Sequence, residues 1–320
     1  MKITILDKYA MGEDLSMNTL KRFGEVVIYN ATSNDEITDH IADSDVIVLN
    51  KVKITDQHMA AAKNLKLICI FATGYDNIDI QAAKRREIAV CNVPGYSTNS
   101  VVLFTLSNVL ALYSKLFEYN QFVKSGEYSE SGVPNKLTPV FHELHGKVWG
   151  IVGLGNIGKA VAKVAEAMGA HVIANKRTYD DAYECVEIDE LCRRSDIITL
   201  HCPLNDGTKN LINKDRIDLM KREVVIVNEA RGAVVNEEDI RDAILSGRIA
   251  GYGSDVYSLE PFPTSHPFNS IKNKSNVLLT PHAAWGAYES RVRCLDIICQ
   301  NIDAFIKGKI LNRVDKPKQN

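Results

Sequence analysis

The 320-residue sequence lacks an excess of charge of either sign, and it lacks a long apolar run. It has 38 Lys and Arg residues against 40 Asp and Glu residues, which gives a formal net charge of −2. A chain so close to neutral has no electrostatic footprint for nucleic acid or an anionic membrane. Its most membrane-like stretch, residues 100–117, is interrupted by Thr105, Asn108 and Lys115 and is short for a span of about 20 residues. We therefore expect a buried helix there, with neither a membrane nor a nucleic acid as partner.

Paired cysteines and a secretion signal are also missing. The seven cysteines are an odd number and form no CxxC motif, and most lie in apolar runs where a thiol behaves as a small buried side chain. The N-terminal apolar run ends at Asp7, too early for the core of a signal peptide. This cysteine usage suits a reducing compartment, so we expect a cytoplasmic protein without disulfides or a metal site.

Short β-rich runs alternate with helical patterns along the chain. The first hundred residues contain runs at 3–7, 25–30, 45–50, 66–71 and 88–93. A second series follows at 147–152, 171–175, 196–202, 223–228, 249–256 and 276–280. Strands separated by helix-length gaps indicate βα units, so we expect an α/β protein with two doubly wound parallel sheets. An amphipathic helix is predicted after them, at 287–307.

One glycine-rich stretch lies between a predicted strand and a predicted helix. The strand at 147–152 leads directly into the sequence GLGNIG, residues 153–158. In this context the pattern predicts a dinucleotide site: Gly153 permits a tight turn, Gly155 lets the backbone approach a pyrophosphate, and Gly158 lets the helix pack on the strand. Asn156 and Ile157 begin the helix, whose N-terminus offers N–H groups to phosphates. The alternative is a glycine-rich turn that binds no ligand.

The residues that end the next strand select the cofactor. An NAD site usually has an Asp or Glu there, about 20 residues beyond the fingerprint, which binds the ribose 2′-hydroxyl. Here the strand ends in Asn175-Lys176-Arg177-Thr178. Two cations and two small polar groups form a pocket for a 2′-phosphate, so we expect NADP to be preferred, with NAD also usable. The alternative is a solvated basic turn, with Asp180 or Asp181 as the ribose acid.

Three further motifs follow strands of the second series and contain Arg231, Glu260 and His282. Ligands of open α/β sheets bind outside the carboxyl ends of the strands, so all three residues fall on the ligand side. Each has an ordinary alternative: a surface charge, a turn carboxylate or a loop histidine. Together they supply what reduction of a 2-oxo acid needs. A cation holds the carboxylate, an imidazolium protonates the developing alkoxide, and a carboxylate keeps the imidazole charged.

Over essentially its whole length the sequence resembles the D-isomer-specific 2-hydroxyacid dehydrogenase family, most strongly its glycerate dehydrogenase/hydroxypyruvate reductase branch. The strings that carry the resemblance are LNK (49–51), FATGYDNID (71–79), NVPGYSTNSV (92–101), GKVWGIVGLGNIG (146–158), NEARG (228–232), DVYSLEP (255–261) and PHAAWGAYESR (281–291). The resemblance implies NAD(P)H-dependent reduction of a small 2-oxo acid, such as hydroxypyruvate or glyoxylate, to the D-2-hydroxy acid. It also implies a Rossmann NAD(P)-binding domain, residues 99–285, inserted into a flavodoxin-like substrate-binding domain, residues 1–98 completed by 286–320.

The resemblance assigns roles to individual residues. Arg231 would bind the substrate carboxylate, and His282 would be the acid/base with Glu260 as its partner. Lys51 would lie near the substrate, whose carboxylate the Thr73-Gly74-Tyr75 backbone would cradle. Asp255 would face the nicotinamide carboxamide, and the rest of the cofactor cleft would be lined by Pro203, Thr208, Glu229 and Ala230.

Two positions depart from the family pattern. Val102-Leu103-Phe104 stands where the family often has an Ala-Glu-His type of run, and Glu229 stands where it usually has a small Thr or Ser. Either difference could alter the cleft, so the choice of substrate stays open. A different kind of function is open too. The C-terminal binding protein co-repressors keep this fold and similar site residues while acting as cofactor-sensing interaction proteins.

The predicted helix at 100–117 also bears on assembly. Apolar side chains surround it on nearly every side, and one subunit surface covers only part of that circumference. Because the family forms dimers through the equivalent segment, we expect a two-fold homodimer with this helix in the interface. The alternative is a helix buried entirely within its own chain.

Overall fold

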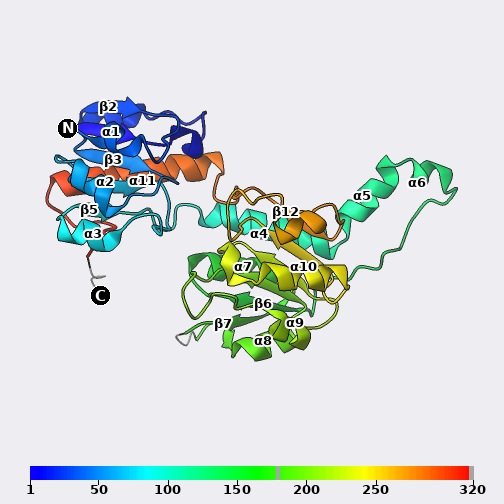
Figure 1. Ribbon diagram of the computed structural model, residues 1–320. Coiled ribbons are helices and arrows are strands. Elements are labelled where there is room, and N and C mark those ends of the chain that lie inside the picture. Colours follow the sequence, from blue (N-terminus) through cyan, green and yellow to red (C-terminus); the bar gives the residue numbers. More distant parts are fainter. Residues whose placement is uncertain (178–180, 317–320) are drawn as a thin grey trace. The chain divides into compact units, whose positions relative to one another are not determined.

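The computed structural model describes residues 1–177 and 181–316, which form two compact units (Figure 1). The first unit comprises Met1–Ser97 and the C-terminal segment from Gly286 onward, and the second comprises Thr98–Trp285. Thr178, predicted to bind a 2′-phosphate, lies outside the described residues, as does Asp180.

The first unit is built on a five-stranded parallel sheet with the order β2-β1-β3-β4-β5. Its strands are β1 (Lys2–Ile5), β2 (Glu25–Ile28), β3 (Val46–Leu49), β4 (Leu67–Ile70) and β5 (Ala89–Cys91). All five coincide with predicted runs. This order is flavodoxin-like, and its topological switch point lies between β1 and β3.

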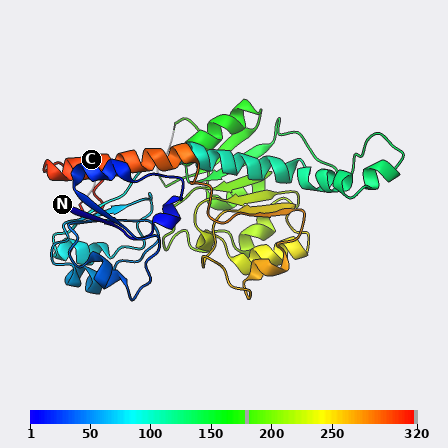
Figure 2. The same ribbon diagram turned by 90° about the horizontal axis from the view of Figure 1, so that it is seen from above.

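Helices cover both faces of this first sheet. The helices α1 (Ile37–Ile41), α2 (Asp56–Ala61) and α3 (Ile80–Arg85) share an apolar cluster with alternate residues of β3, β4 and β5. The long helix α11 (Tyr288–Ile306) packs against β4 and the short 3-10 helix η2 (Asn18–Phe23) on the other face, while η1 (Lys8–Met11) follows β1 (Figure 2). The amphipathic helix predicted at 287–307 is therefore present and covers a sheet formed by the N-terminal part of the chain.

The second unit is built on a seven-stranded parallel sheet with the order β12-β11-β10-β9-β6-β7-β8. Its strands are β6 (Val148–Val152), β7 (His171–Asn175), β8 (Glu184–Cys185), β9 (Ile197–Leu200), β10 (Val225–Asn228), β11 (Gly251–Ser254) and β12 (Val277–Leu279). All but β8 coincide with predicted runs; β8 has two residues and is too short to show a pattern. This is the Rossmann arrangement, with its switch point between β6 and β9.

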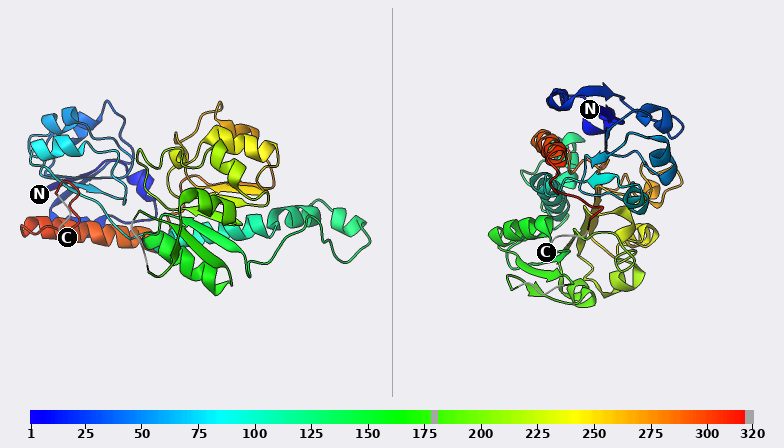
Figure 3. Two further views of the ribbon diagram at one scale, coloured as in Figure 1. Left: turned by 90° about the horizontal axis from the view of Figure 1, so that it is seen from below. Right: turned by 90° about the vertical axis from the view of Figure 1, so that its left-hand side faces the viewer.

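Helices flank the second sheet on both faces (Figure 3). The helices α4 (Thr98–Tyr113) and α7 (Asn156–Ala167) share a core with Trp149 and Ile151 of β6. The helices α8 (Ile188–Arg194), α9 (Lys214–Leu219) and α10 (Glu237–Leu245) pack over the alternate residues, Val152 among them. Two 3-10 helices, η3 (Gly232–Val234) and η4 (Pro267–Ser270), complete the unit. Strands buried on both faces read as continuous apolar runs, so a polar motif at a strand end is conspicuous.

The prediction of one buried helix over 100–117 is wrong at its C-terminal end. The helix α4 ends at Tyr113, Lys115 has a left-handed backbone (φ 57°), and α5 (Leu116–Lys124) then turns away by 65°. The reason is that α4 packs on β10, β11 and α7, whereas every residue of α5 stays at least partly exposed. With α6 (Glu127–Glu130) and the chain to residue 143, α5 forms an arm that projects from the sheet (Figures 1 and 2). In the described ranges no single helix has the length and hydropathy to cross a membrane, although α4 and α5 pass that test if taken together across their bend.

Candidate active site

The glycine loop joins β6 to α7 at the switch point of the second sheet. A Cβ on Gly153, whose φ is +95°, would lie 2.6 Å from the backbone N of Cys202, and a Cβ on Gly158 would lie 2.2 Å from the Gly153 carbonyl oxygen. Packing within the protein therefore requires glycine at both positions. Gly155 is different: its φ is −85°, and a Cβ there would meet no atom of the described chain within 4 Å. Packing within the protein therefore does not require glycine at position 155. The open space beside Gly155 would let a pyrophosphate approach the backbone closely, so the loop fits a dinucleotide.

The end of β7 lies directly beside this loop. The Asn175 carbonyl accepts the Gly153 N–H at 3.0 Å, and the Asn175 side chain donates to the Val186 carbonyl at 3.0 Å. Lys176 is half-buried, while Arg177 and Asp181 are exposed. The two predicted cations thus follow the strand end that adjoins the glycine loop, and the amide of Asn175 is used in holding that strand end.

Two predicted site residues form a hydrogen-bonded pair. His282 Nδ1 lies 2.5 Å from Glu260 Oε2, and both side chains are about three-quarters buried, with 25% and 29% exposed. Glu260 Oε1 accepts the backbone N–H of Tyr257 at 3.0 Å, so both carboxylate oxygens have a fixed partner. The backbone of His282 is left-handed, with a φ of 53°, a conformation that is strained for a residue with a side chain. Strain of this kind is concentrated at functional sites, where the surroundings enforce it.

Asp255, at the end of β11, helps to hold the backbone on both sides of His282 in place. It is 1% exposed, and its Oδ1 accepts hydrogen bonds from Thr280 Oγ1 at 2.6 Å and from the Ala283 N–H at 2.8 Å. Its Oδ2 accepts the Ala284 N–H at 2.8 Å. The carboxylate therefore clamps residues 280–284 on either side of His282. Sequence reasoning assigned Asp255 to the cofactor alone and missed this role.

Arg231 follows β10, the neighbour of β11. The side chain of Asn228 holds this turn, since its Nδ2 donates to the Arg231 carbonyl at 3.0 Å and its Oδ1 accepts the Ala230 N–H at 3.1 Å. A Cβ on the next residue, Gly232, would lie 1.9 Å from the carbonyl carbon of Tyr257. The Arg231 segment therefore packs directly against the loop that carries Glu260. Arg231, Glu260 and His282 follow three strands that are neighbours in the sheet, β10, β11 and β12.

Glu229 is a buried carboxyl group between Arg231 and the end of β10. Its Oε1 accepts a hydrogen bond from Asn108 Nδ2 of α4 at 2.8 Å, and its Oε2 is buried without a hydrogen-bond partner among the described residues. Burial, assisted by the negative charge of Asp255, raises the pKa of Glu229 to about 8. The side chain is therefore mostly neutral at pH 7. Asn108 was missed as a site residue, although a polar residue inside an apolar run was the signal for it.

The loop after β9 borders the glycine loop on its other side. Thr208 Oγ1 donates to the Pro203 carbonyl at 2.6 Å and accepts the Asn205 N–H at 2.8 Å, which closes the turn between them. Both ring nitrogens of His201 are buried without hydrogen-bond partners in the part of the chain that the structure describes. Burial lowers the pKa of His201 to about 3, so its imidazole is neutral. No sequence pattern pointed to His201.

In the first unit, Lys51 follows β3, and residues 73–75 follow its neighbour β4. The buried Asp7 accepts the N–H groups of Asn50, Lys51 and Val52, at 2.9, 2.6 and 3.3 Å respectively, and burial raises the pKa of Asp7. The Thr73 hydroxyl donates to the Val93 carbonyl at 2.8 Å, and Tyr75 is 40% exposed. Asp7 was missed as the residue that fixes the Lys51 backbone; its place at the end of β1 was the available signal.

Two kinds of feature are lacking from the described residues. Among residues 1–177 and 181–316, no group of three or more His, Cys, Asp or Glu side chains is arranged to hold a metal ion. All seven cysteines lie within those ranges, and none is in a disulfide there.

Comparison with known proteins gives consistent matches. Residues 106–284 match the D-isomer specific 2-hydroxyacid dehydrogenase, NAD binding domain. A hydroxypyruvate reductase of Blautia hydrogenotrophica is 37% identical over 325 residues, which cover 99% of this chain and 100% of the relative. The structure of an acyclic imino acid reductase in complex with NADPH and D-arginine has a TM-score of 0.86 at 29% identity, covering 98% of this chain and 100% of that one. A D-lactate dehydrogenase from Aquifex aeolicus, complexed with NAD and lactic acid, has a TM-score of 0.87 at 26% identity, with 99% and 100% covered.

Proposed function

The chain belongs to the D-isomer specific 2-hydroxyacid dehydrogenase family, and on this premise we propose that it reduces hydroxypyruvate or glyoxylate with NAD(P)H. It is an oxidoreductase of small 2-oxo acids with a Rossmann NAD(P)-binding domain. The observation that carries the proposal is the His282–Glu260 pair, 2.5 Å apart, whose Glu260 lies in a loop that packs against the Arg231 segment. A carboxylate-binding cation beside a carboxylate-paired imidazole is the set of groups that reduction of a 2-oxo acid requires.

Each of the three residues has a separate task. Arg231 binds the substrate carboxylate and polarises the carbonyl group. His282 gives its proton to the oxygen that becomes the alkoxide, and Glu260 favours the protonated imidazole through its charge. The bound nicotinamide supplies the hydride for the carbonyl carbon. Lys51 and the Thr73-Gly74-Tyr75 backbone contact the substrate. Their place at the carboxyl ends of β3 and β4 supports this assignment.

The cofactor is held by the second unit. The glycine loop with Asn156 and Ile157 receives the pyrophosphate, as the unhindered Gly155 supports. The rest of the cofactor cleft is lined by Pro203, Thr208, Glu229, Ala230 and Asp255. NADP is the preferred cofactor, and Lys176 and Arg177 after β7 support this, together with Asn175 and Thr178 in the sequence. Relatives of this fold have been solved with NADPH and with NAD, so the solved structures leave this choice to experiment.

A substrate panel tests the proposal. Oxidation of NADPH and of NADH is followed at 340 nm with hydroxypyruvate, glyoxylate, pyruvate and phenylpyruvate, and His282→Ala serves as the control for contaminating activity. We expect turnover with hydroxypyruvate or glyoxylate. Tight cofactor binding without turnover of any 2-oxo acid would instead favour a cofactor-sensing interaction protein of the co-repressor type. None of the relatives reported above carries a name of that type.

The exposed arm supports a homodimer. Apolar side chains that are more than a third exposed recur along α4, the arm and the adjoining surface: Leu103, Leu110, Leu116, Phe117, Val123, Tyr128, Val133, Leu137, Val140, Phe141 and Met168. Part of this surface forms a groove of about 380 Å³ between Leu110 and Met168. A concentration of exposed apolar side chains on one part of the surface marks a protein interface. Light scattering at micromolar concentration should give twice the 35.6 kDa monomer mass, and the monomer mass would refute the dimer.

We propose a cytoplasmic location. The observation that supports it is that all seven cysteines, which lie in the described ranges, are outside disulfides, as expected in a reducing compartment. Thiol titration of the denatured protein, purified without reductant, should find seven thiols. Fewer thiols would indicate oxidation to disulfides and count against this location.

A further inference from the structure

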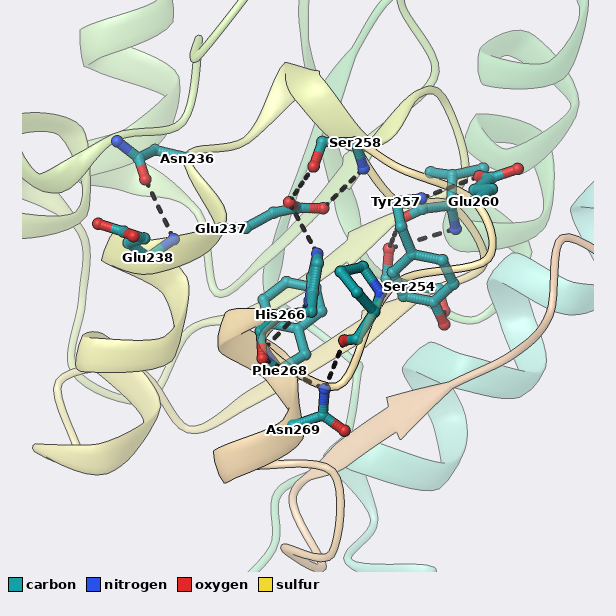
Figure 4. A network of polar contacts seen from close by, with 12 residues as sticks. Asn236, Glu237, Glu238, Ser254, Tyr257, Ser258, Glu260, His266, Phe268 and Asn269 are labelled. Carbon is teal, nitrogen blue, oxygen red and sulfur yellow. Dashed lines mark hydrogen bonds and ion pairs between the residues drawn. The ribbon is translucent and has the colours of Figure 1, made fainter.

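A buried carboxylate lies behind the loop that carries Glu260 (Figure 4). Glu237 is the first residue of α10 and is 9% exposed. Its Oε1 accepts the backbone N–H of Ser258 at 2.9 Å. Its Oε2 accepts hydrogen bonds from Ser258 Oγ and, at 3.0 Å, from His266 Nε2. Glu237 is thus tied to a loop 21 residues further along the chain by both of its oxygens.

The geometry fixes which atom of His266 carries the proton. His266 Nδ1 accepts the backbone N–H of Phe268 at 3.2 Å, so this nitrogen is unprotonated. The proton is therefore on Nε2, which donates it to Glu237. The ring cannot turn freely, because it is 4% exposed, stacks on Phe262 at 4.6 Å and meets the edge of Phe268 at 5.0 Å. Glu237 consequently faces two N–H donors whose directions are fixed, one from the backbone of Ser258 and one from this imidazole.

The loop held in this way contacts Glu260 and the chain segments that carry His282 and Arg231. Tyr257, beside Ser258, donates its N–H to Glu260 Oε1 at 3.0 Å. The Tyr257 hydroxyl donates to the Thr280 carbonyl at 2.8 Å, two residues before His282. The Gly232 backbone lies against Tyr257 and Ser258 so closely that a Cβ would be 2.1 Å from the Ser258 nitrogen. A shift of Ser258 would therefore move the N–H that orients Glu260.

We propose that Glu237, through Ser258 and with His266, is a positioning residue that holds Glu260 against His282. This inference rests on the proposed function, since the pair it positions is the proposed acid/base pair. Glu237 itself acts only through the loop and contacts neither member of the pair.

Glu237→Gln is a sharp perturbation because an amide cannot replace this carboxylate. If the Gln oxygen accepts the Ser258 N–H, its NH₂ group faces the Nε2–H of His266. If the amide is flipped, the NH₂ group faces the Ser258 N–H instead. Either way two donors oppose each other, and a buried donor is left without an acceptor. The volume of the side chain is unchanged, so the effect reports the hydrogen bonds and the charge.

The experiment compares wild type, Glu237→Gln, Glu260→Gln and the double variant in the full-length protein. Ile240→Val is the matched control, since it removes one buried methyl group from the same helix without touching the network. The readouts are the pH profile of kcat/KM for 2-oxo acid reduction, the Kd of NADPH, and the amide exchange rate of Tyr257, which needs no activity. We expect Glu237→Gln to speed exchange at Tyr257, to lower kcat about 10-fold, and to move the descending limb of the pH profile to lower pH by roughly half a unit. The Kd of NADPH should change less than about two-fold.

The outcomes separate the two proposals. In the Glu260→Gln background, Glu237→Gln should cause no further shift of the pH profile, because it acts through Glu260. An equal shift in both backgrounds would overturn the inference. Unchanged Tyr257 exchange and an unchanged profile in Glu237→Gln, with wild-type turnover intact, would overturn it too. Absence of wild-type turnover with every 2-oxo acid refutes the proposed function instead, and the exchange rate of Tyr257 then still decides whether Glu237 holds the loop.

Discussion

The buried carboxyl group of Glu229 makes the stability of the second unit depend on pH. Its Oε1 has one partner, Asn108, its Oε2 is buried without a hydrogen-bond partner in the described chain, and Asp255 adds a like charge. The perturbation we consider is Glu229→Gln. Gln keeps the acceptor for Asn108 and nearly the same volume but cannot ionise.

The sign and size of the effect follow from the pKa. Burial, with the Asp255 charge second, raises the pKa of Glu229 from 4.5 to about 8 in the folded protein. Between these two values the folded state keeps a proton that the unfolded chain has lost, so stability falls as pH rises and levels off above pH 8. The slope is at most about 1.4 kcal/mol per pH unit, and the total loss over the window is roughly 3–5 kcal/mol. In Glu229→Gln this contribution is absent.

Tryptophan fluorescence measures the relevant unfolding. The chain has two tryptophans, Trp149 on β6 and Trp285, and both lie in the second unit with Glu229. Urea unfolding followed by this signal at pH 5, 6, 7 and 8 gives the free energy of unfolding of each protein. The free energy of unfolding of the Gln variant should exceed that of wild type by an amount that grows with pH, from near zero at pH 5 to a few kcal/mol at pH 8.

A neighbouring glutamate provides the control. Glu238, on α10, is exposed, and Glu238→Gln makes the same carboxylate-to-amide change in this unit without touching the buried site. Parallel stability curves for wild type and Glu229→Gln across the four pH values would refute the reasoning. They would mean that Glu229 is ionised, and stabilised as an anion, in the folded protein.

Three further predictions concern the proposed site. His282→Ala should lower kcat about 10²- to 10⁴-fold while the Kd of NADPH, measured by fluorescence, stays nearly constant; a parallel loss of cofactor binding would mean a structural role. Lys176→Asp should erase or invert an NADPH preference that is worth about 1–3 kcal/mol, or roughly 5- to 150-fold in kcat/KM, and raised salt should reduce the wild-type preference. A wild-type kcat/KM with NADH that equals or exceeds the value with NADPH would contradict this. Gly232→Ala puts a methyl group 1.9 Å from the Tyr257 carbonyl carbon, so we expect a lower Tm and lower kcat, and a normally active, equally stable variant would contradict the packing described.

Much of the fold followed from local patterns in the sequence. Apolar runs and helix-length gaps predicted eleven of the twelve strands found in residues 1–177 and 181–316, because a strand buried on both faces carries its pattern within a few residues. The signal for the glycine loop was equally local, because the tight turn, the close approach of the backbone to a pyrophosphate and the packing of the helix on the strand each need a glycine at one position. Arg231, Glu260 and His282 could be placed on the ligand side for a similar reason, since strand ends locate them without any knowledge of contacts.

The tertiary structure decided everything that depends on partners far apart in the sequence. The Glu229–Asn108 bond joins residues 121 positions apart, and the clamp of Asp255 on Ala284 joins residues 29 apart. No periodicity encodes such pairs, because they arise from which helices and loops meet over the sheet. The break after Tyr113 was missed for the same reason: apolar residues continue to the end of the run 100–117, but the surface that α4 packs against ends before the run does. The sequence by itself determined the elements and the residues at their ends, whereas burial and non-local hydrogen bonding determined their protonation, orientation and support.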